Sequence, residues 1–347
     1  MDRELRFREY LPRLIDLDRT KLEMFLKSQG LEYEDDIIYA CGYADDQDHL
    51  LACACCSYNT LKCFAIDSEL RGSNLSGQMI SNLISNRIQE GVSHLFVFTK
   101  PENVALFESS GFYIIAETNN VVMLENKAAG IEQYIRSLRV NTWDSDTIGA
   151  IVMNCNPFTL GHRYLIEYAS KLCEKLYIFV VEENQSAFSY DVRLTLVKQG
   201  VSDLDNVTVY PSGPYIISSS TFPTYFLKKD IDVTLTQAEL DIAIFAQRIA
   251  PALNIKLRFV GEEPKCHTTQ KYNNAMKRIL PEYGVEIVEI PRKETECGNV
   301  ISASTVRARL SAEGVGEWLH DFVPRTTYEF LCNPEGKTII EKLKQPI

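Results

Sequence analysis

The most constraining feature of this sequence is a regular alternation of short apolar runs and amphipathic stretches, which begins near Thr147. The runs TIGAIVMN, KLYIFVVE, NVTVYP, IKLRFVG and VEIVEIP have the β-branched and aromatic composition of buried strands. The stretches HRYLIEYASKLCEK, YDVRLTLVKQGVSDL and KYNNAMKRIL have helical spacing. Strands that alternate with helices predict parallel βαβ construction. Right-handed crossovers then bring the C-terminal ends of the strands to one edge, where such sheets bind ligands.

The first ~125 residues show a different α/β pattern. A helix is predicted near 19–29, followed by β-type runs at 37–44, 50–58 and 61–67. Apolar residues at 75, 79, 80, 83, 84 and 88 then form one helical stripe. HLFVFT predicts a strand, ENVALFESS a short helix and GFYIIAE a further strand. We therefore predict a first domain over 1–128, a linker over 129–146 and a second domain over 147–347.

Composition and charge narrow the class of protein. The chain has 347 residues, 45% of them hydrophobic, which is enough for two cores of ordinary domain size. Its formal net charge of -11 disfavours a nucleic-acid partner. The first twenty residues contain no apolar run of the signal-peptide kind, and no later stretch approaches a membrane span. We expect a cytoplasmic protein that does not bind a membrane, with its ten cysteines mostly as reduced core thiols and no metal site.

The most informative stretch is IVMNCNPFTLGHRYLIEY, over 151–168. A buried strand ends at Asn154, a turn containing Asn156, Pro157 and Phe158 follows, and an amphipathic helix opens at Gly161 and His162. The free N–H groups and partial positive charge of a helix N-terminus suit a nucleotide phosphate. Glycine lets the phosphate approach the backbone, and a histidine can donate hydrogen bonds as charge builds at the α-phosphorus.

This stretch resembles the HxGH signature of the cytidylyltransferase-like nucleotidyltransferase superfamily, in a form with Thr159 in the first position. The resemblance implies that Thr159 and His162 line the phosphates of ATP. A second stretch is similar to that superfamily's ISxSxxR element, which binds the triphosphate through hydroxyls, backbone and an arginine. Its matching positions are Ile301, Ser302, Ser304, Thr305 and Arg307. Short hydroxyl side chains suit helix N-termini, and a guanidinium matches phosphate geometry.

Each stretch also has an ordinary structural interpretation. A histidine at a helix start is commonly a capping or packing residue, so His162 alone is a weak signal. Ser302 and Ser304 can simply cap a helix, with Arg307 and Arg309 in solvent. The two stretches in this order, each between a strand and a helix, favour nucleotide binding.

The resemblance extends over nearly the whole second domain to the citrate lyase ligases. It is carried by NPFTLGHRYLIE, GPYIISSSTFPTYFLK, FVGEEP, YNNAMKRILPEYGVEIVEIPRKE and ISASTVRARL. The resemblance implies that acetate reacts with Mg²⁺-bound ATP to give acetyl-adenylate and pyrophosphate. The acetyl group then passes to the thiol of the CoA-like prosthetic group on the acyl carrier subunit of citrate lyase, which activates that lyase. We expect Thr159, Gly161 and His162 to stabilise the transition state and Arg307 to hold the leaving pyrophosphate.

Other positions follow from the same resemblance. Arg193 resembles a basic position beside the nucleotide, although a solvated helix charge is an equal alternative. Gly261 corresponds to a contact with adenosine. Glu262 and Glu263 follow it, either shaping the pocket and helping to hold Mg²⁺ or forming a solvated turn. The segment SSSTFPTYFLK, which includes Ser218–Thr221, predicts either a loop over the acyl site or an ordinary turn.

The first domain resembles the GCN5-related N-acetyltransferase (GNAT) fold. LRGSNLSG, over 70–77, is similar to that fold's loop for the pyrophosphate of acyl-CoA, and NVALFESSGF, over 103–112, is similar to its end motif. The loop departs from the pattern because Asn74 and Ser76 stand where glycine or alanine is usual. The resemblance implies a GNAT-like α/β domain ahead of a Rossmann-like nucleotidyltransferase domain. We expect the first domain to cradle the prosthetic arm without acetylating an amine.

Two other functions remain open from the sequence. The chain resembles adenylyltransferases in general, whose acceptors include phosphopantetheine and mononucleotides, because the phosphate-binding stretches are shared. It is also compatible with an ATP-binding module that regulates a lyase without turnover.

Overall fold

The computed structural model describes residues 5–139, 145, 147–183, 186–217, 222–227, 231–263, 266–295, 298 and 300–344. The chain divides into two compact units. The first comprises Met1–Gln133 and Phe222–Thr236, and the second comprises Tyr134–Thr221 and Gln237–Ile347. A segment from the middle of the expected second domain therefore belongs to the first unit.

The expected linker contains a helix. Helix α4 spans Gly130–Leu138, where the sequence had suggested a connection over 129–146. Its last turns belong to the second unit, where the Tyr134 hydroxyl donates a hydrogen bond to the Pro211 carbonyl at 3.1 Å. The Tyr210 hydroxyl donates in turn to the Leu138 carbonyl at 2.8 Å. These bonds attach α4 to the second unit by its carboxyl-terminal half.

The first unit is built on a seven-stranded sheet in the order β1-β2-β3-β4-β5-β7-β6. The helices follow the apolar stripes that the sequence predicted, and β1 and β7 are strands that it did not predict. The strands are β1 Arg6–Tyr10, β2 Tyr39–Ala44, β3 Leu50–Cys56, β4 Thr60–Ile66, β5 Phe96–Thr99, β6 Tyr113–Glu117 and β7 Val122–Glu125. The helices are α1 Asp16–Ser28, α2 Leu75–Gln89 and α3 Val104–Glu108.

Strands β4 and β5 form the one parallel pair of this sheet, and they separate soon after they meet. Thr60 pairs with Phe96 and Leu61 with Val97, and the described pairing between the two strands stops there. Beyond that point β4 stays with β3 and β5 stays with β7. We call the space between residues 62–66 of β4 and residues 98–99 of β5 the β4–β5 opening.

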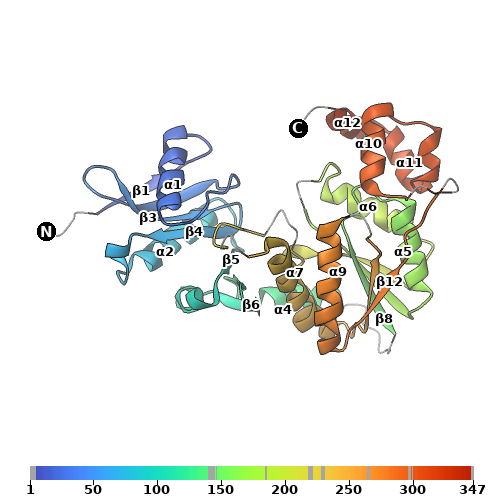
Figure 1. Ribbon diagram of the computed structural model, residues 1–347, viewed down its shortest axis with the longest axis horizontal. Coiled ribbons are helices and arrows are strands. Elements are labelled where there is room, and N and C mark those ends of the chain that lie inside the picture. The colour runs from blue at the N-terminus through green and yellow to red at the C-terminus, as the bar shows by residue number, and fades with distance from the viewer. Residues whose placement is uncertain are drawn as a thin grey trace. The chain divides into compact units, whose positions relative to one another are not determined.

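The second unit is an α/β unit with a five-stranded parallel sheet, which confirms the fold class predicted for it (Figure 1). Its strands are β8 Ile148–Met153, β9 Lys175–Val180, β10 Val207–Pro211, β11 Leu257–Gly261 and β12 Glu286–Ile290. Its helices, besides the end of α4, are α5 Leu160–Ser170, α6 Tyr190–Gly200, α7 Val233–Ile244, α8 Ala250–Ala252, α9 His267–Ile279, α10 Ala303–Glu313, α11 Arg325–Cys332 and α12 Pro334–Lys344. The first turn of α7 groups with the first unit.

The strand order β10-β9-β8-β11-β12 indicates which edge of the sheet is expected to bind a ligand. The chain adds β9 and β10 on one side of β8, then crosses to add β11 and β12 on the other side. The order therefore reverses between β8 and β11. In open parallel sheets, ligands bind at the C-terminal ends of the strands beside such a reversal.

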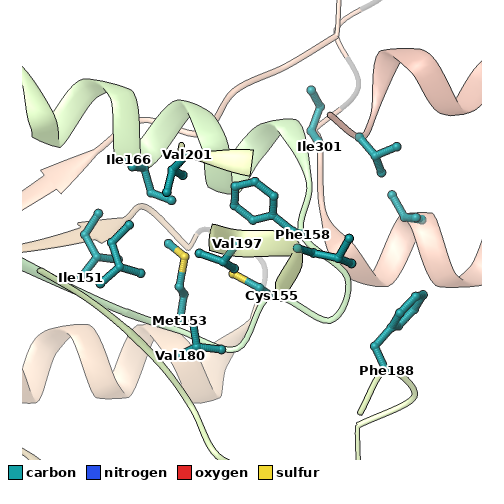
Figure 2. Close-up of a cluster of buried hydrophobic side chains, with 14 of the residues drawn as sticks. Ile151, Met153, Cys155, Phe158, Ile166, Val180, Phe188, Val197, Val201 and Ile301 are labelled. Atoms are coloured by element: carbon teal, nitrogen blue, oxygen red, sulfur yellow. The ribbon is translucent and has the colours of Figure 1, made fainter. Parts of the chain in front are cut away.

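A buried apolar cluster supports the turn after β8 (Figure 2). Phe158 is fully buried and lies among side chains of β8, β9 and α6. A Cβ on Gly200 would meet the Phe158 ring at 2.3 Å, so the ring packs directly on the α6 backbone. Ile301, just before α10, belongs to the same cluster. Because these side chains interlock, the start of α5 and the segment before α10 are fixed by one core.

The structure bears on two expectations from the sequence, the reduced state of the cysteines and the absence of a membrane span. The described cysteines are free, and seven of them are buried, as expected for core thiols; Cys266 is exposed. Within the described residues, no helix combines the length and the apolar character that crossing a membrane requires.

Candidate functional site

The site begins where β8 turns into α5, and Thr159 sets the geometry of that turn. Thr159 is the N-cap of α5, with extended backbone angles. Its hydroxyl accepts a hydrogen bond from the His162 N–H, and its own N–H donates to Nδ1 of the His162 ring at 3.1 Å. The two residues thus form a reciprocal capping box, with histidine in the place usual for Glu or Gln. The cap fixes the His162 ring at the start of the helix.

The protonation of His162 follows from this cap. Because Nδ1 accepts from a backbone N–H, the neutral ring carries its proton on Nε2. Burial, aided by the nearby positive charge of Arg292, lowers the pKa of His162 to about 4. At neutral pH the ring is therefore an uncharged donor that presents its Nε2–H group. The capping interpretation is confirmed. The functional one stays a prediction that this geometry allows, because one nitrogen caps the helix and leaves the other free to donate.

Gly161 allows the two sequence stretches to meet. A Cβ at Gly161 would lie 2.8 Å from the carbonyl oxygen of Ile301, which is closer than real Cβ contacts. Leu160 donates its N–H to the Phe322 carbonyl, and the His162 N–H is used in the cap. Among the described residues, the N–H of Gly161 finds no acceptor. A glycine here therefore lets α5 approach the Ile301 backbone and leaves a donor at the helix start.

The second stretch also opens a helix. Ser302 is the N-cap of α10, and its hydroxyl accepts a hydrogen bond from the Thr305 N–H at 3.1 Å. The Ser304 hydroxyl lies 3.0 Å from that of Ser302, and the Thr305 hydroxyl lies 2.8 Å from it. Three hydroxyls are thus gathered at the positive end of an eleven-residue helix. Hydroxyls and a helix N-terminus in this arrangement favour a bound anion.

A cavity of about 780 Å³ joins the two helix starts. Its volume is within the range of small-molecule sites. Eight of the residues predicted from the sequence line it: Thr159, Gly161, His162, Gly261, Ile301, Ser302, Ser304 and Thr305. Tyr164, Leu165, Ile290, Pro291, Val300 and Phe322 add apolar walls. The cavity therefore combines anion-binding ends with surface suited to a flat, apolar group.

The sequence analysis missed the cations of this cavity. Arg292, Lys293 and Arg309 line it, against one described carboxylate, Glu263. The Arg292 guanidinium donates to the Glu262 carbonyl and pairs with Glu263. The Lys293 ammonium lies 5.9 Å from the centre of the Tyr164 ring, and Arg309 stacks on Trp318. An acidic chain thus carries a locally cationic cavity, which attracts a polyphosphate.

Two signals in the sequence point to these cations. Arg292 and Lys293 directly follow β12, at the strand end where parallel sheets bind ligands. Arg309 lies four residues after Thr305, on the same face of α10. The motif position Arg307 lies on a different face.

Arg307 connects the two stretches from outside the cavity lining. Its guanidinium donates to the carbonyl of Asn156, in the turn before α5. This bond ties α10 to the turn that carries Thr159. Its predicted contact with pyrophosphate stays a prediction, because Arg307 is absent from the described lining.

The turn residues Asn154, Asn156, Pro157 and Phe158 are not in the described lining of the cavity. The Asn154 amide donates to Glu183 and Ser186, both at 3.2 Å. The Asn156 side-chain oxygen accepts from the Phe188 N–H at 3.1 Å. The Asn156–Pro157 peptide bond is cis, and Pro157 and Phe158 are buried. These residues shape the turn, and their predicted contacts with a nucleotide stay predictions.

Arg193 is a structural cation in this geometry. Its side chain is fully buried, and it donates to the carbonyls of Asn154, Phe188, Val181 and Glu183 at 2.8 to 3.0 Å, and to the Asn154 side chain at 2.6 Å. Arg193 does not appear in the described lining of the cavity. We therefore interpret Arg193 as the support of the β8 turn, which corrects the solvated alternative. Its contact with a nucleotide stays a prediction.

Glu262 and the serine-rich segment complete the predicted residues. Glu262 is exposed and lines a smaller cavity of about 250 Å³ with Asn273 and Glu289, so it is not in the main cavity. Residues 218–221, proposed as a loop over the acyl site, lie outside the described residues.

Comparison with known proteins agrees with the family predicted from the sequence. The family model described as "Citrate lyase ligase C-terminal domain" matches residues 148–331. The chain is 41% identical to a citrate (pro-3S)-lyase ligase of Haemophilus influenzae over 89% of this chain and 94% of that protein. It is also 41% identical to the Klebsiella pneumoniae protein of the same name, over 90% of this chain and 92% of that protein.

Solved structures are similar at a lower level. Pantothenate synthetase from Thermus thermophilus is 15% identical, with a TM-score of 0.35 over 50% of this chain and 65% of that chain. The residues matched by the family model, 148–331, include the starts of α5 and α10 and the cationic strand end after β12. The chain belongs to the citrate lyase ligase family of enzymes.

Proposed function

We propose that the chain activates acetate with ATP as acetyl-adenylate and transfers the acetyl group to a protein-bound thiol. The acceptor is the CoA-like prosthetic group on the acyl carrier subunit of citrate lyase, and its acetylation activates that enzyme. Family membership supports this reaction class. The observation that carries the proposal is the cavity in which the starts of α5 and α10 converge.

The residues present suit ATP. Two helix starts and the cations Arg292, Lys293 and Arg309 offer donors and positive charge to a triphosphate. Gly261 and the apolar walls remain for the adenosine. Mg²⁺ would neutralise part of the phosphate charge when bound with ATP, and Glu263 is the lining carboxylate able to approach it.

In the first step, an acetate oxygen attacks the α-phosphorus and the bond to the β-phosphate oxygen breaks, releasing pyrophosphate. Charge builds on the α-phosphate oxygens as this happens. In this proposal the Nε2–H of His162 and the backbone N–H of Gly161, which line the cavity, donate to those oxygens. Because both are uncharged donors fixed by the helix start, they need no reorganisation during the step.

The cations act on the leaving group. Lys293 and Arg309 are separated from His162 along the sequence but line the same cavity, so they can hold the departing pyrophosphate. In the second step the thiol sulfur attacks the acetyl carbonyl, and AMP leaves with the electron pair of the acyl–oxygen bond. The thiol proton goes to solvent or to the AMP phosphate, since an acyl-adenylate is already activated.

Exchange of labelled pyrophosphate into ATP tests the reaction class. With acetate present and the carrier absent, the purified chain should catalyse this exchange, and omission of acetate should abolish it. The other adenylyltransferase function predicts exchange that needs phosphopantetheine or a mononucleotide and ignores acetate. A regulatory module without turnover predicts neither exchange nor AMP formation.

A further inference from the structure

The β4–β5 opening of the first unit is a place where an extended ligand would be expected to bind. When two parallel strands separate, the backbone N–H and C=O groups that face the gap lose their ladder partners. An extended chain with amide groups can satisfy them by adding as a strand. The prosthetic arm predicted as the ligand of this unit has that character. The opening is therefore the natural place for the cradle suggested by the sequence.

A segment of the same chain already lies at this opening. Residues Phe222–Leu227, which we call the strap, group with the first unit although they follow the second unit's β10 in sequence. The Phe222 ring packs edge-on against Phe98 of β5, with ring centres 5.8 Å apart. On the β4 side, burial and the nearby Cys63 raise the pKa of the Tyr225 phenol. The strap thus contacts both strands just beyond their last pair.

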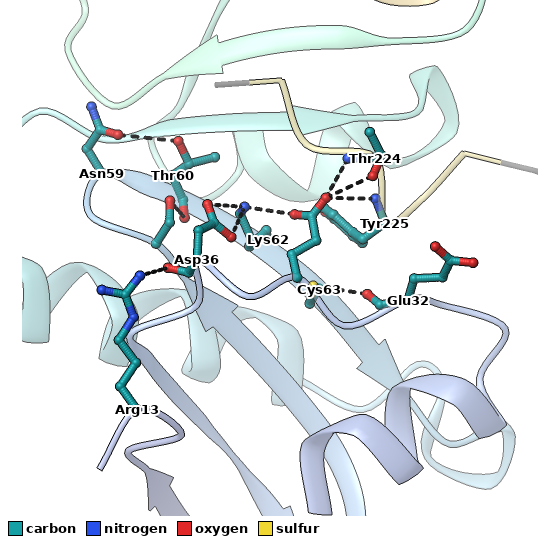
Figure 3. A network of polar contacts seen from close by, with 11 residues as sticks. Arg13, Glu32, Asp36, Asn59, Thr60, Lys62, Cys63, Thr224 and Tyr225 are labelled. Atoms are coloured by element: carbon teal, nitrogen blue, oxygen red, sulfur yellow. Dashed lines mark hydrogen bonds and ion pairs between the residues drawn. The ribbon is translucent and has the colours of Figure 1, made fainter. Parts of the chain in front are cut away.

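A charge network centred on the buried Lys62 holds the strap (Figure 3). One oxygen of Glu34 accepts from the N–H groups of Thr224 at 2.6 Å and Tyr225 at 3.2 Å, and from the Thr224 hydroxyl at 3.2 Å. The other oxygen accepts from the Lys62 ammonium at 2.7 Å. Lys62 lies on β4, is 4% exposed in its side chain and also pairs with Asp36 at 2.8 Å. The carboxylate therefore joins the strap to the strand that borders the opening.

The aromatic side chains of the strap are as buried as those of a hydrophobic core. Phe222 is 5% exposed, and Tyr225 and Phe226 are each 7% exposed. Aromatic side chains carry large apolar areas, so their removal from this position would return much apolar surface to water. A ligand that displaced the strap would also leave the Glu34 carboxylate without its three donors.

We propose that the strap is the permanent occupant of the β4–β5 opening, so that the first unit binds no CoA-like arm there. This replaces the cradle predicted from the sequence. The weak match of residues 70–77 to a pyrophosphate-binding loop agrees with a unit that does not bind a CoA-like arm. The inference concerns the first unit alone and does not depend on acetate being the substrate of the second.

Hydrogen exchange of the full-length protein tests the proposal. Pantetheine is the probe, because it has the arm's amides and thiol but no nucleotide that would enter the cavity of the second unit. In the unaltered protein, excess pantetheine should leave exchange in residues 62–66 and 98–99 unchanged. Slower exchange there on adding pantetheine would show an opening available to ligands and would overturn the proposal.

Variants of Glu34 test what holds the strap. Glu34→Ala should speed amide exchange at Thr224 and Tyr225 about tenfold or more, the scale of losing hydrogen bonds to a carboxylate. Glu34→Gln keeps the acceptor oxygen, so its exchange there should remain within about threefold of the unaltered protein. Asp35→Ala is the matched control, because its side chain is exposed and pairs with Arg19 instead of the strap. Equal exchange in Glu34→Ala and Asp35→Ala would contradict the proposal.

Pyrophosphate exchange measured on the same preparations keeps the two proposals separate. Failure of the unaltered protein to exchange pyrophosphate with acetate would reject the proposed function and leave the strap untouched.

Discussion

The molecule has two openings between separated structural elements. One is lined by groups that can bind a ligand, and the other is filled by side chains of the same chain. At the C-terminal edge of the second unit's sheet, a cavity is lined by helix starts and cations. In the first unit, the β4–β5 opening is occupied by aromatic side chains and bordered by the ion pair of the buried Lys62 with Glu34. Unsatisfied backbone donors and charge mark a place built for a ligand, whereas apolar burial with satisfied charges marks a place already filled.

The two units also differ in how their buried cations are surrounded. Removal of these cations gives the largest predicted loss of stability. Arg193→Met should lower the free energy of unfolding of the second unit by about 3–5 kcal/mol, because it strands several carbonyl oxygens and the Asn154 side chain. Lys62→Met should destabilise the first unit less, by about 1–3 kcal/mol, since Asp36 remains half exposed to water. Chemical denaturation, followed separately in each unit, measures both. Equal losses of unfolding free energy in the two variants would contradict this difference between the units.

The next effect concerns catalysis at the open site. His162→Ala should reduce acetate-dependent pyrophosphate exchange by about a hundredfold or more, the scale of one lost donor to developing charge. His320→Ala is the control, since His320 stacks on Tyr328 with ring centres 4.0 Å apart and does not line the cavity. A loss of less than about threefold in His162→Ala would assign the residue to capping alone.

A smaller effect on catalysis is expected from a substitution that prevents the close contact between α5 and the Ile301 backbone. Gly161→Ala places a methyl group 2.8 Å from a carbonyl oxygen that cannot easily move, so kcat/KM for ATP in the exchange reaction should fall about tenfold. Gly261→Ala should cost less, because Gly261 lies on the same cavity, beside the proposed adenosine, but has open space around the added atom. If both variants behave alike, the close approach at Gly161 has no functional role.

The smallest effect is a pH dependence of stability. The pKa of His162 is lowered from 6.5 to about 4, so the folded state resists a proton that the unfolded chain accepts. The stability due to neutral His162 is therefore present above pH 6.5 and is lost as pH falls toward 4. From pH 7 to pH 6 this loss is less than about 1 kcal/mol. His162→Gln should show a shallower decrease over that interval, and an identical slope would contradict the lowered pKa.

The sequence predicted the parts of this molecule that local pattern determines. The strand–turn–helix at Thr159 and the helix start at Ser302 were predicted because capping residues and apolar periodicity are local signals. Their meeting across one cavity was expected from parallel-sheet topology. The α/β class of both units follows from the same patterns.

The parts that were missed depend on contacts between distant segments. From the sequence, Arg193 looks like an ordinary charged residue on the solvent side of a helix. Only the fold shows that carbonyl groups from two turns surround it. The strap has no local pattern that assigns it to the first unit, because Glu34 and Thr224 are 190 residues apart. Ion pairs and aromatic contacts at such separations are not encoded in spacing.

The central claim is that the starts of α5 and α10 hold one triphosphate together. The most direct measurement is a crystal structure of the full chain with a non-hydrolysable ATP analogue. The account predicts phosphate oxygens within hydrogen-bond distance of both the His162 ring and the Ser302–Thr305 segment. A nucleotide bound at only one of these helix starts, or elsewhere on the molecule, would contradict it.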